Sequence, residues 1–131
     1  MADRYIKCVA NKYGGHGALS LGQALMVSCN DVMMQISAKL GKEKFLDYMD
    51  AFGLGRKTGI DLPGEATGTV FNNDTMHSTQ LATSSFGQSQ TVTMVQMAAA
   101  FSAIVNGGNY YRPPCSRRSF QRVRSGDPIG G

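Results

Sequence analysis

The sequence predicts a single, mainly helical domain, and three observations support this fold class. The chain has 131 residues, which is the size of one modest domain with its own core. Hydrophobic residues make up 42% of it, yet no stretch approaches the roughly 18 uninterrupted apolar residues of a membrane-spanning helix. Apolar residues recur at helical spacing in several segments, whereas few segments alternate as strands do.

Two helical patterns occupy the first half of the chain. The first runs over residues 20–40 and ends at Gly41. The second runs over residues 45–52 and is stopped by Gly53. Leu54 follows that glycine, which suits the hydrophobic contact of a glycine-capped helix end. We therefore expect two helices in close succession.

The second half begins with a segment of loop and short strand over residues 54–75, which glycine and proline punctuate. A short helix is expected over residues 78–84. A longer helix begins at Thr93, because Gln96 three residues later completes a capping box. One face of that helix is lined by Met94, Met97, Phe101 and Ile104, and its alanines at 98–100 allow a neighbour to approach closely.

Gly107-Gly108 ends this helix, and Tyr110-Tyr111 begins a strand that Pro113 cuts short. Strands are too few for a complete sheet. The body of the protein is therefore expected to be mainly helical.

The net charge of +4 is confined to the end of the chain. Residues 1–111 carry eight basic and eight acidic side chains, which sum to zero, and residues 112–131 carry five arginines and one aspartate. A basic tail can bind phosphate backbones, but this one has no interleaved aromatic residue beyond Phe120. We expect a disordered tail and no nucleic-acid partner.

Cysteine and histidine are too sparse for a metal site or a disulfide scaffold. The three cysteines cannot all pair, no C-x-x-C occurs, and neither histidine has neighbours at metal-ligand spacing. We expect no metal and no cofactor.

The tripeptide Ser28-Cys29-Asn30 conflicts with the helical pattern around it. Ser28 falls on the apolar stripe, whereas Asn30 would point about 200° away in an unbroken helix. An interruption near residues 28–30 would let both side chains face one cleft, and Asn30 or Asp31 could then cap the following helix. We therefore expect the helix to be broken here. As an isolated pattern, S-x-N carries little information.

Three longer blocks place that tripeptide in context. They read GGHGALSLGQALMVSCNDVMMQISAKLG, FGLGRKTGIDLPGEATG and SFGQSQTVTMVQMAAAFSAIVNGGNYYRP. Together they resemble the transpeptidase domain of class B penicillin-binding proteins, of the division and sporulation type, the stage V sporulation protein D-like group. The resemblance covers residues 15–113. It implies a mainly α fragment of the α+β serine β-lactamase/transpeptidase-like fold.

The resemblance also implies a site. Members of the family are acyl-serine enzymes that cross-link peptidoglycan stem peptides and are acylated by β-lactams, with S-x-x-K, S-x-N and K-T-G motifs. Ser28 and Asn30 match the S-x-N motif. By resemblance, the serine belongs to the proton-transfer network, and the asparagine holds the substrate amide and orients the lysine.

The other two motifs are missing from the 131 residues. No serine is followed by lysine three positions later. Lys57-Thr58-Gly59 belongs to a different family block, on a loop after a helix, so we interpret it as unrelated to the active-site K-T-G. Stem peptide and β-lactams are the implied ligands of the full-length family, but we expect this chain alone to be an inactive fragment.

The domain organisation follows from these boundaries: an unassigned segment at 1–14, a partial transpeptidase domain at 15–113, and an Arg-rich tail at 114–131. A truncated or frameshifted reading of a longer gene would produce this pattern, in which the family resemblance is confined to residues 15–113. Family members carry the domain outside the cytoplasm on a membrane anchor, which this sequence lacks, so its location stays open. The alternative function is a non-enzymatic helical module that binds another cell-wall protein; a nucleic-acid binder acting through the tail is a third.

Overall fold

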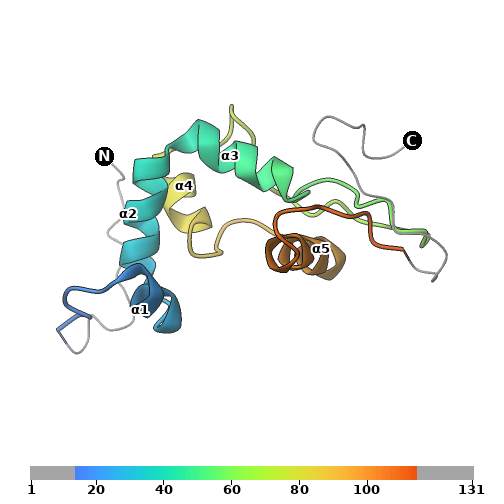
Figure 1. Ribbon diagram of the computed structural model, residues 1–131. Helices are drawn as coiled ribbons and strands as arrows, with labels where there is room; N and C mark the ends of the chain where they lie inside the picture. Colours follow the sequence, from blue (N-terminus) through green and yellow to red (C-terminus); the bar gives the residue numbers. More distant parts are fainter. Residues whose placement is uncertain (1–13, 115–131) are drawn as a thin grey trace. The chain divides into compact units, whose positions relative to one another are not determined.

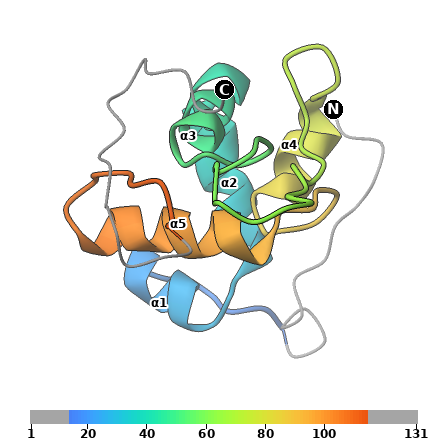
Figure 2. The ribbon, with the colours of Figure 1, turned by 90° about the vertical axis from the view of Figure 1, so that its right-hand side faces the viewer.

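The computed structural model describes residues 14–114, and helices form most of their regular structure (Figures 1 and 2). In chain order these are α1 (Leu21–Met26), α2 (Asn30–Leu40), α3 (Lys42–Ala51), α4 (Ser78–Ser84) and α5 (Met94–Val105). Within the described range, extended pairing is limited to isolated bridges, one of which joins Thr69 to Thr91 in antiparallel orientation. The mainly α prediction is confirmed.

Most of the predicted elements are present. The short helix at residues 78–84 and the capping box of Thr93 and Gln96 are confirmed. The strand expected at Tyr110-Tyr111 is reduced to a single bridging residue, Tyr111. The expected N-terminal segment and arginine tail lie outside the described residues, apart from Gly14 and Pro114 at their inner edges.

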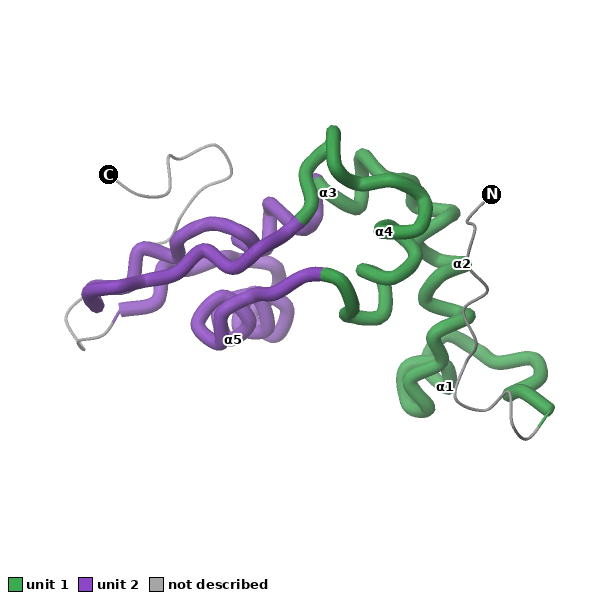
Figure 3. The backbone as a smooth tube through the Cα atoms, turned by 180° about the vertical axis from the view of Figure 1, so that it is seen from behind, with its two compact units in different colours: residues 1–46, 71–89 green, residues 47–70, 90–131 purple. Residues whose placement is uncertain are grey.

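The chain divides into two compact units (Figure 3). One unit takes in Met1–Leu46 and Phe71–Ser89, and the other takes in Asp47–Val70 and Gln90–Gly131. Each unit is built from segments that are distant in sequence, and the chain passes from the first to the second within α3.

In the first unit α2 packs against α4, and α1 contacts α2. The loop before α4 is shaped by Asn72, whose side-chain carbonyl accepts hydrogen bonds from the N–H groups of Asp74 and Thr75 (3.0 and 2.9 Å). The buried side chains of this unit are mostly small: Ala24, Cys29, Ser37, Met76 and Ser84.

The second unit is organised around Gln96, whose side chain is completely buried. Its Oε1 accepts from the Thr93 N–H (2.8 Å), and its own N–H donates to Thr93 Oγ1 (3.1 Å). Its Nε2 donates to the carbonyl oxygens of Arg56 (2.6 Å) and Thr67 (2.9 Å). The amide thus caps α5 and holds two stretches of the 54–70 loop at the first turn of that helix. Figure 2 shows α5 from the side.

The structure buries the alanine face of α5, made of Gln96, Ala99, Ala100 and Ala103. The face lined by Met94, Met97, Phe101 and Ile104 stays exposed, with exposed fractions between 41% and 89%. The sequence correctly placed these four side chains on one face, but the buried face is the opposite one. Methyl side chains let neighbouring backbone come close to a helix, which suits the alanines of the buried face.

Two kinds of feature are absent from the described part of the chain. None of its helices is both long and apolar enough to cross a membrane. Nor do residues 14–114 contain a group of three or more His, Cys, Asp or Glu side chains that could hold a metal ion.

Gln96→Glu is expected to destabilise the chain far more than Gln23→Glu. Both residues complete a capping box, and glutamate serves that role as well as glutamine does. Only Gln96 also donates to two loop carbonyls, which a carboxylate would leave unsatisfied. We expect Gln96→Glu to lower the unfolding free energy by about 2–4 kcal/mol, and the exposed Gln23→Glu to change it by less than about 0.5 kcal/mol. Urea unfolding of the whole chain measures the unfolding free energy of both variants. Equal effects would contradict the role of the Gln96 amide in holding the loop.

Candidate functional site

The motif Ser28-Cys29-Asn30 forms the connection between α1 and α2 in the first unit. α1 begins with a capping box, in which Ser20 Oγ accepts from the Gln23 N–H (3.3 Å) and Gln23 Oε1 accepts from the Ser20 N–H (2.9 Å). It ends after Met26, and residues 27–29 are not helical. The predicted interruption of the helix is confirmed.

Two backbone hydrogen bonds close the end of α1. The Ser28 N–H donates to the Leu25 carbonyl (3.1 Å), and the Cys29 N–H donates to the Ala24 carbonyl (2.9 Å). This pair of bonds defines a Schellman motif, whose residue after the C-cap adopts the left-handed conformation. Ser28 occupies that position with a φ of 48°.

A serine at this position contrasts with the other helix ends of the chain. α3, α4 and α5 are followed at the equivalent left-handed position by Gly53, Gly87 and Gly107, with φ of 71°, 86° and 83°. The left-handed conformation costs a residue with a Cβ atom roughly 1–2 kcal/mol. α1 therefore ends without the glycine that usually occupies this position after a helix.

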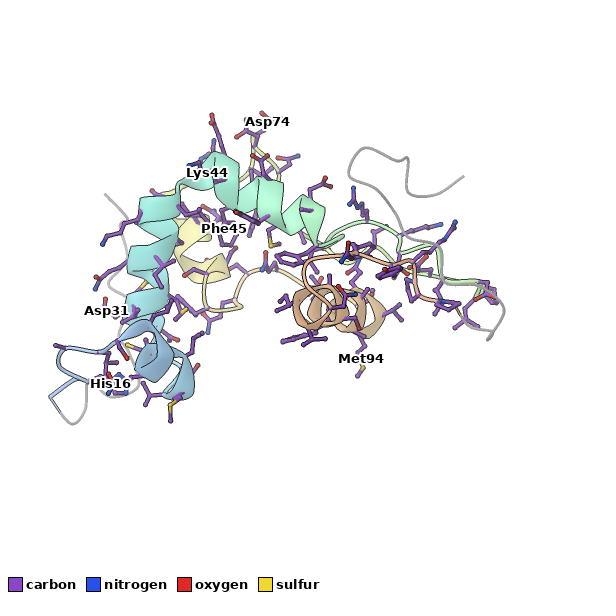
Figure 4. The ribbon with its side chains drawn as sticks, viewed as in Figure 1. His16, Asp31, Lys44, Phe45, Asp74 and Met94 are labelled. Carbon is purple, nitrogen blue, oxygen red and sulfur yellow. The ribbon has the colours of Figure 1, made fainter. Side chains whose placement is uncertain are left out.

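Cys29 anchors the turn between the two polar residues of the motif. Its backbone is extended (φ −76°, ψ 106°) and its side chain is buried. Ser28 before it is exposed and Asn30 after it is half-buried. Asp31, labelled in Figure 4, follows directly in the first turn of α2 and accepts a hydrogen bond from Gln35 Nε2 (3.3 Å).

The expectation that Asn30 or Asp31 caps the second helix is wrong. The N-cap of α2 is Cys29, and no side chain makes the capping hydrogen bond. Because Ser28 closes α1 and only Cys29 is extended, α2 already begins at Asn30. The side chains of Asn30 and Asp31 therefore lie inside the first turn of α2, and the Asn30 amide makes no capping hydrogen bond.

The chemistry available at this turn is that of a hydroxyl and an amide. Each can donate and accept hydrogen bonds, which suits binding a substrate amide and passing on a proton. A serine becomes a nucleophile when a base lies within hydrogen-bond reach of it. One helical turn after Ser28 the chain has Asp31 and Val32 rather than lysine, so α2 supplies no amine base there.

Lys57-Thr58-Gly59 lies in the second unit, on a loop as predicted. The N–H and the hydroxyl of the buried Thr58 both donate to Glu65 Oε1 (2.6 Å each), and the Gly59 N–H donates to Glu65 Oε2 (3.1 Å). Arg112 Nε donates to the Gly59 carbonyl (2.6 Å). Lys57 is exposed. The polar groups of this tripeptide thus serve to close the loop.

Hydrogen bonding lowers the pKa of the Glu65 carboxyl from its ordinary value of 4.5. Burial is the largest single influence and raises the pKa, but the bonds from Thr58 and Gly59, together with the charge of Lys57, outweigh it. The unfolded chain therefore binds a proton at Glu65 more readily than the folded chain does. Glu65 stabilises the fold above its ordinary pKa, and this stabilisation is lost as the pH falls through the lowered pKa.

A family model for the penicillin binding protein transpeptidase domain matches residues 2–120. The chain belongs to the penicillin-binding protein transpeptidase family. The resemblance carried by the three sequence blocks is thereby confirmed. The matched range includes both the S-x-N turn and the Lys57-Thr58-Gly59 loop.

The relatives of this chain are much longer proteins. Stage V sporulation protein D from Bacillus subtilis (strain 168) is 45% identical over 102 residues, which are 78% of this chain and 16% of that protein. Penicillin-binding protein PbpB from Mycobacterium tuberculosis is 36% identical over 81 residues, 62% of this chain and 12% of that protein. The chain thus spans 16% and 12% of the lengths of these two relatives.

Solved transpeptidases share the fold. The transpeptidase domain of penicillin-binding protein 3 from Burkholderia pseudomallei matches with a TM-score of 0.74 at 25% identity, over 89% of this chain and 34% of that one. Penicillin binding protein 3 from M. tuberculosis, solved in complex with aztreonam, matches with a TM-score of 0.66 at 30% identity, over 79% and 24%. The predicted fold class, a mainly α part of the transpeptidase fold, is confirmed.

Ser28→Gly is expected to stabilise the chain, because it removes the Cβ atom from a left-handed position. We expect the unfolding free energy to rise by about 0.5–1 kcal/mol. Gly107→Ser is the matched reverse change, since Gly107 is also left-handed and a Cβ atom there meets nothing within 4 Å. It should lower the unfolding free energy by a similar amount in the same urea experiment. A destabilising Ser28→Gly would contradict the left-handed helix end.

The protection of the 58–65 loop is expected to depend on pH through Glu65. Below pH 4.5, protonation of the Glu65 carboxyl weakens its bonds to Thr58 and Gly59, so their amide protection factors should fall. Glu65→Gln should reduce this protection already at neutral pH and remove most of its pH dependence. Hydrogen exchange followed by NMR tests both statements, with the amide of Thr69 in its backbone bridge as an internal reference.

Proposed function

We propose that residues 15–113 form the S-x-N-bearing part of a peptidoglycan D,D-transpeptidase and that Ser28 and Asn30 line its active site. The supporting observation is the helix end at Ser28, where a serine stands in a conformation that three other helix ends give to glycine. Strained non-glycine residues concentrate at functional sites, where a side chain is needed despite its cost in stability. Here the side chain retained is an exposed hydroxyl next to the Asn30 amide.

In this proposal a serine and lysine outside these 131 residues perform the covalent step. That serine attacks the stem-peptide carbonyl, the C–N bond breaks, and the leaving amine takes up a proton as the acyl-enzyme forms. An acceptor amine from a second stem peptide then attacks the ester, forms the cross-link and returns the serine. Ser28 passes the proton within this network, while Asn30 binds the substrate amide and orients the lysine.

β-Lactams acylate the same kind of serine, and the M. tuberculosis relative was solved with aztreonam and with ampicillin. We propose β-lactam binding for the complete transpeptidase that contains this segment. The 131 residues lack an S-x-x-K serine, and the Thr58 hydroxyl of the only K-T-G tripeptide is engaged by Glu65. Both observations support the view that the segment alone is not acylated.

The alternative is a non-enzymatic module that binds another cell-wall protein. The exposed apolar side chains of α1 and α5 favour it. It differs from the transpeptidase proposal in one respect that can be measured, because a binding module would not require the hydroxyl of Ser28 or the amide of Asn30.

The isolated chain is expected to remain unlabelled by a fluorescent penicillin at high concentration and long incubation. The physical reason is that Ser28 has no amine base one helical turn away. Intact-mass spectrometry of the chain after incubation measures the adduct directly. A stoichiometric adduct that disappears in Ser28→Ala would show that both the motif and the missing nucleophile have been misread.

A chimera tests the positive part of the proposal. Residues 15–113 replace the aligned stretch of B. subtilis stage V sporulation protein D, and acylation by fluorescent penicillin is followed over time. Ser28→Ala and Asn30→Ala should each slow acylation by at least about 100-fold, the usual effect of removing a proton-transfer or positioning group. Ser102→Ala and Asn73→Ala are the matched controls at exposed positions and should leave the rate unchanged. Equal rates in all four variants would reject the assigned roles.

A further inference from the structure

The turn that follows α5 contains the one Asn-Gly pair of the chain. Of the six asparagines in the sequence, only Asn106 precedes a glycine. Asn106 is the C-cap of α5 and is exposed, as are Gly107 and Gly108. The chain turns back directly after this point (Figure 2). Asparagine is a thermolabile residue, and a following glycine leaves the neighbouring backbone nitrogen the widest conformational freedom.

The chemistry available at such a pair is ring closure between backbone and side chain. The Gly107 nitrogen gives its proton to hydroxide or water and attacks Cγ of Asn106. An N–Cγ bond forms, the Cγ–Nδ2 bond breaks, and the side-chain nitrogen leaves as ammonia with a proton taken from water. Attack within one chain needs no encounter of two reactants. Water then opens the five-membered imide at either carbonyl, which leaves aspartate or isoaspartate.

The structure leaves the attacking nitrogen unobstructed. Within residues 14–114, the Gly107 N–H makes no hydrogen bond that would hold it in place. A Cβ atom added at Gly107 or at Gly108 would meet nothing within 4 Å. No neighbouring group therefore blocks the approach of this nitrogen to the Asn106 side chain.

The closed turn nevertheless opposes the reaction. Asn106 has a φ of −98° and a ψ of 18°, which directs the Gly107 nitrogen away from the Asn106 side chain. Ring closure requires rotation about the Cα–C bond of Asn106. That rotation breaks the bond from the Gly108 N–H to the Ala103 carbonyl (2.7 Å) and displaces the Asn109 N–H from Asn106 Oδ1 (2.9 Å). Helix ends fray, so such bonds open at a small cost in free energy.

We propose that Asn106 is a site of spontaneous deamidation and that the reaction proceeds through opening of the turn that follows α5. This inference is independent of the proposed function. The co-reactant is water, and no oxidation or reduction takes place. The rate of conversion at Asn106 consequently reports how often this turn opens in the native chain.

The product changes the charge and the backbone of this turn. Its carboxylate lies at the C-terminal end of a helix, where the helix dipole disfavours a negative charge, and residues 75–111 contain no Asp, Glu, Lys or Arg before the change. Isoaspartate also lengthens the backbone by one atom, which shifts the path of the chain toward Tyr110. A Cβ atom at Gly53 would lie only 2.6 Å from Tyr110 Oη, so this close contact is sensitive to such a shift.

The test follows the whole chain by peptide mapping and mass spectrometry during incubation at neutral and mildly alkaline pH. The peptide that contains Asn106 should convert first, into aspartate and isoaspartate forms that chromatography separates. Conversion should be at least about tenfold faster in the chain unfolded by urea than in the native chain, because the closed turn no longer restrains Asn106. The converted native chain should unfold at a lower urea concentration than the unmodified chain.

Gly107→Ala and Gly108→Ala are the matched pair of variants. Both are compared in urea, so that effects on folding do not enter. Gly107→Ala should slow conversion at Asn106 by at least about tenfold, because a Cβ atom beside the attacking nitrogen restricts its approach to Cγ. Gly108→Ala leaves the Asn-Gly pair intact and should react at the wild-type rate.

Each remaining outcome would overturn part of the proposal. Equal rates in the two variants would reject attack by the Gly107 nitrogen. Faster conversion at Asn73 or Asn109 would reject Asn106 as the site. A native chain that converts as fast as the unfolded chain would reject the restraint by the turn. A native chain that stays unmodified while the unfolded chain converts would reject opening of the turn in the native state.

Discussion

The carboxamide of Gln96 is the contact on which the second unit depends. A single buried side chain satisfies the N-terminus of α5 and two carbonyls that lie 40 and 29 residues away in the sequence. Few large apolar side chains are available for this task, since the largest completely buried side chains of the described residues are Met76, Gln96 and Thr58. Where the apolar core is this small, directional hydrogen bonds decide which loop conformation is adopted.

The first unit depends on a constraint of another kind. α2 packs on α4 and begins at Asn30, so only residues 27–29 separate it from the end of α1. A left-handed residue followed by one extended residue meets that requirement, and Ser28 and Cys29 supply them. The strained backbone and the exposed hydroxyl therefore have one cause. A glycine would make the same turn with less strain, but it would carry no hydroxyl.

Sequence reasoning succeeded where the decisive interactions are local. The capping box of α5 and the short helix α4 depend on neighbours three or four residues apart, and both could be predicted. The break near Ser28 was predicted from the opposed directions of two polar side chains, without any glycine to mark it. The expected cap at Asn30 or Asp31 was wrong, because the left-handed Ser28 places the start of α2 one or two residues earlier than the pattern suggested.

The features that could not be predicted depend on residues brought together by loops. The bond between Thr58 and Glu65 exists only once the loop has closed, and no pattern in the sequence pairs a threonine with a carboxylate seven residues later. The hydrogen bonds from the Gln96 amide to the loop could not be predicted for the same reason, because the capping box already accounted for this residue. Which face of α5 is buried was equally open, because large apolar side chains line one face and alanines line the other.

The exposed apolar side chains of α5 and the small interior have a common consequence for the stability of this segment. Burial of large apolar side chains provides most of the free energy of folding, and in the described residues many of these side chains lie outside while alanine, threonine and glutamine lie inside. The hydrogen bonds of Gln96 and Glu65 specify a shape but add little net stability. The exposed apolar side chains of α1 and α5 therefore contribute little to stability, and the loops of the described residues depend on directional hydrogen bonds for their shape.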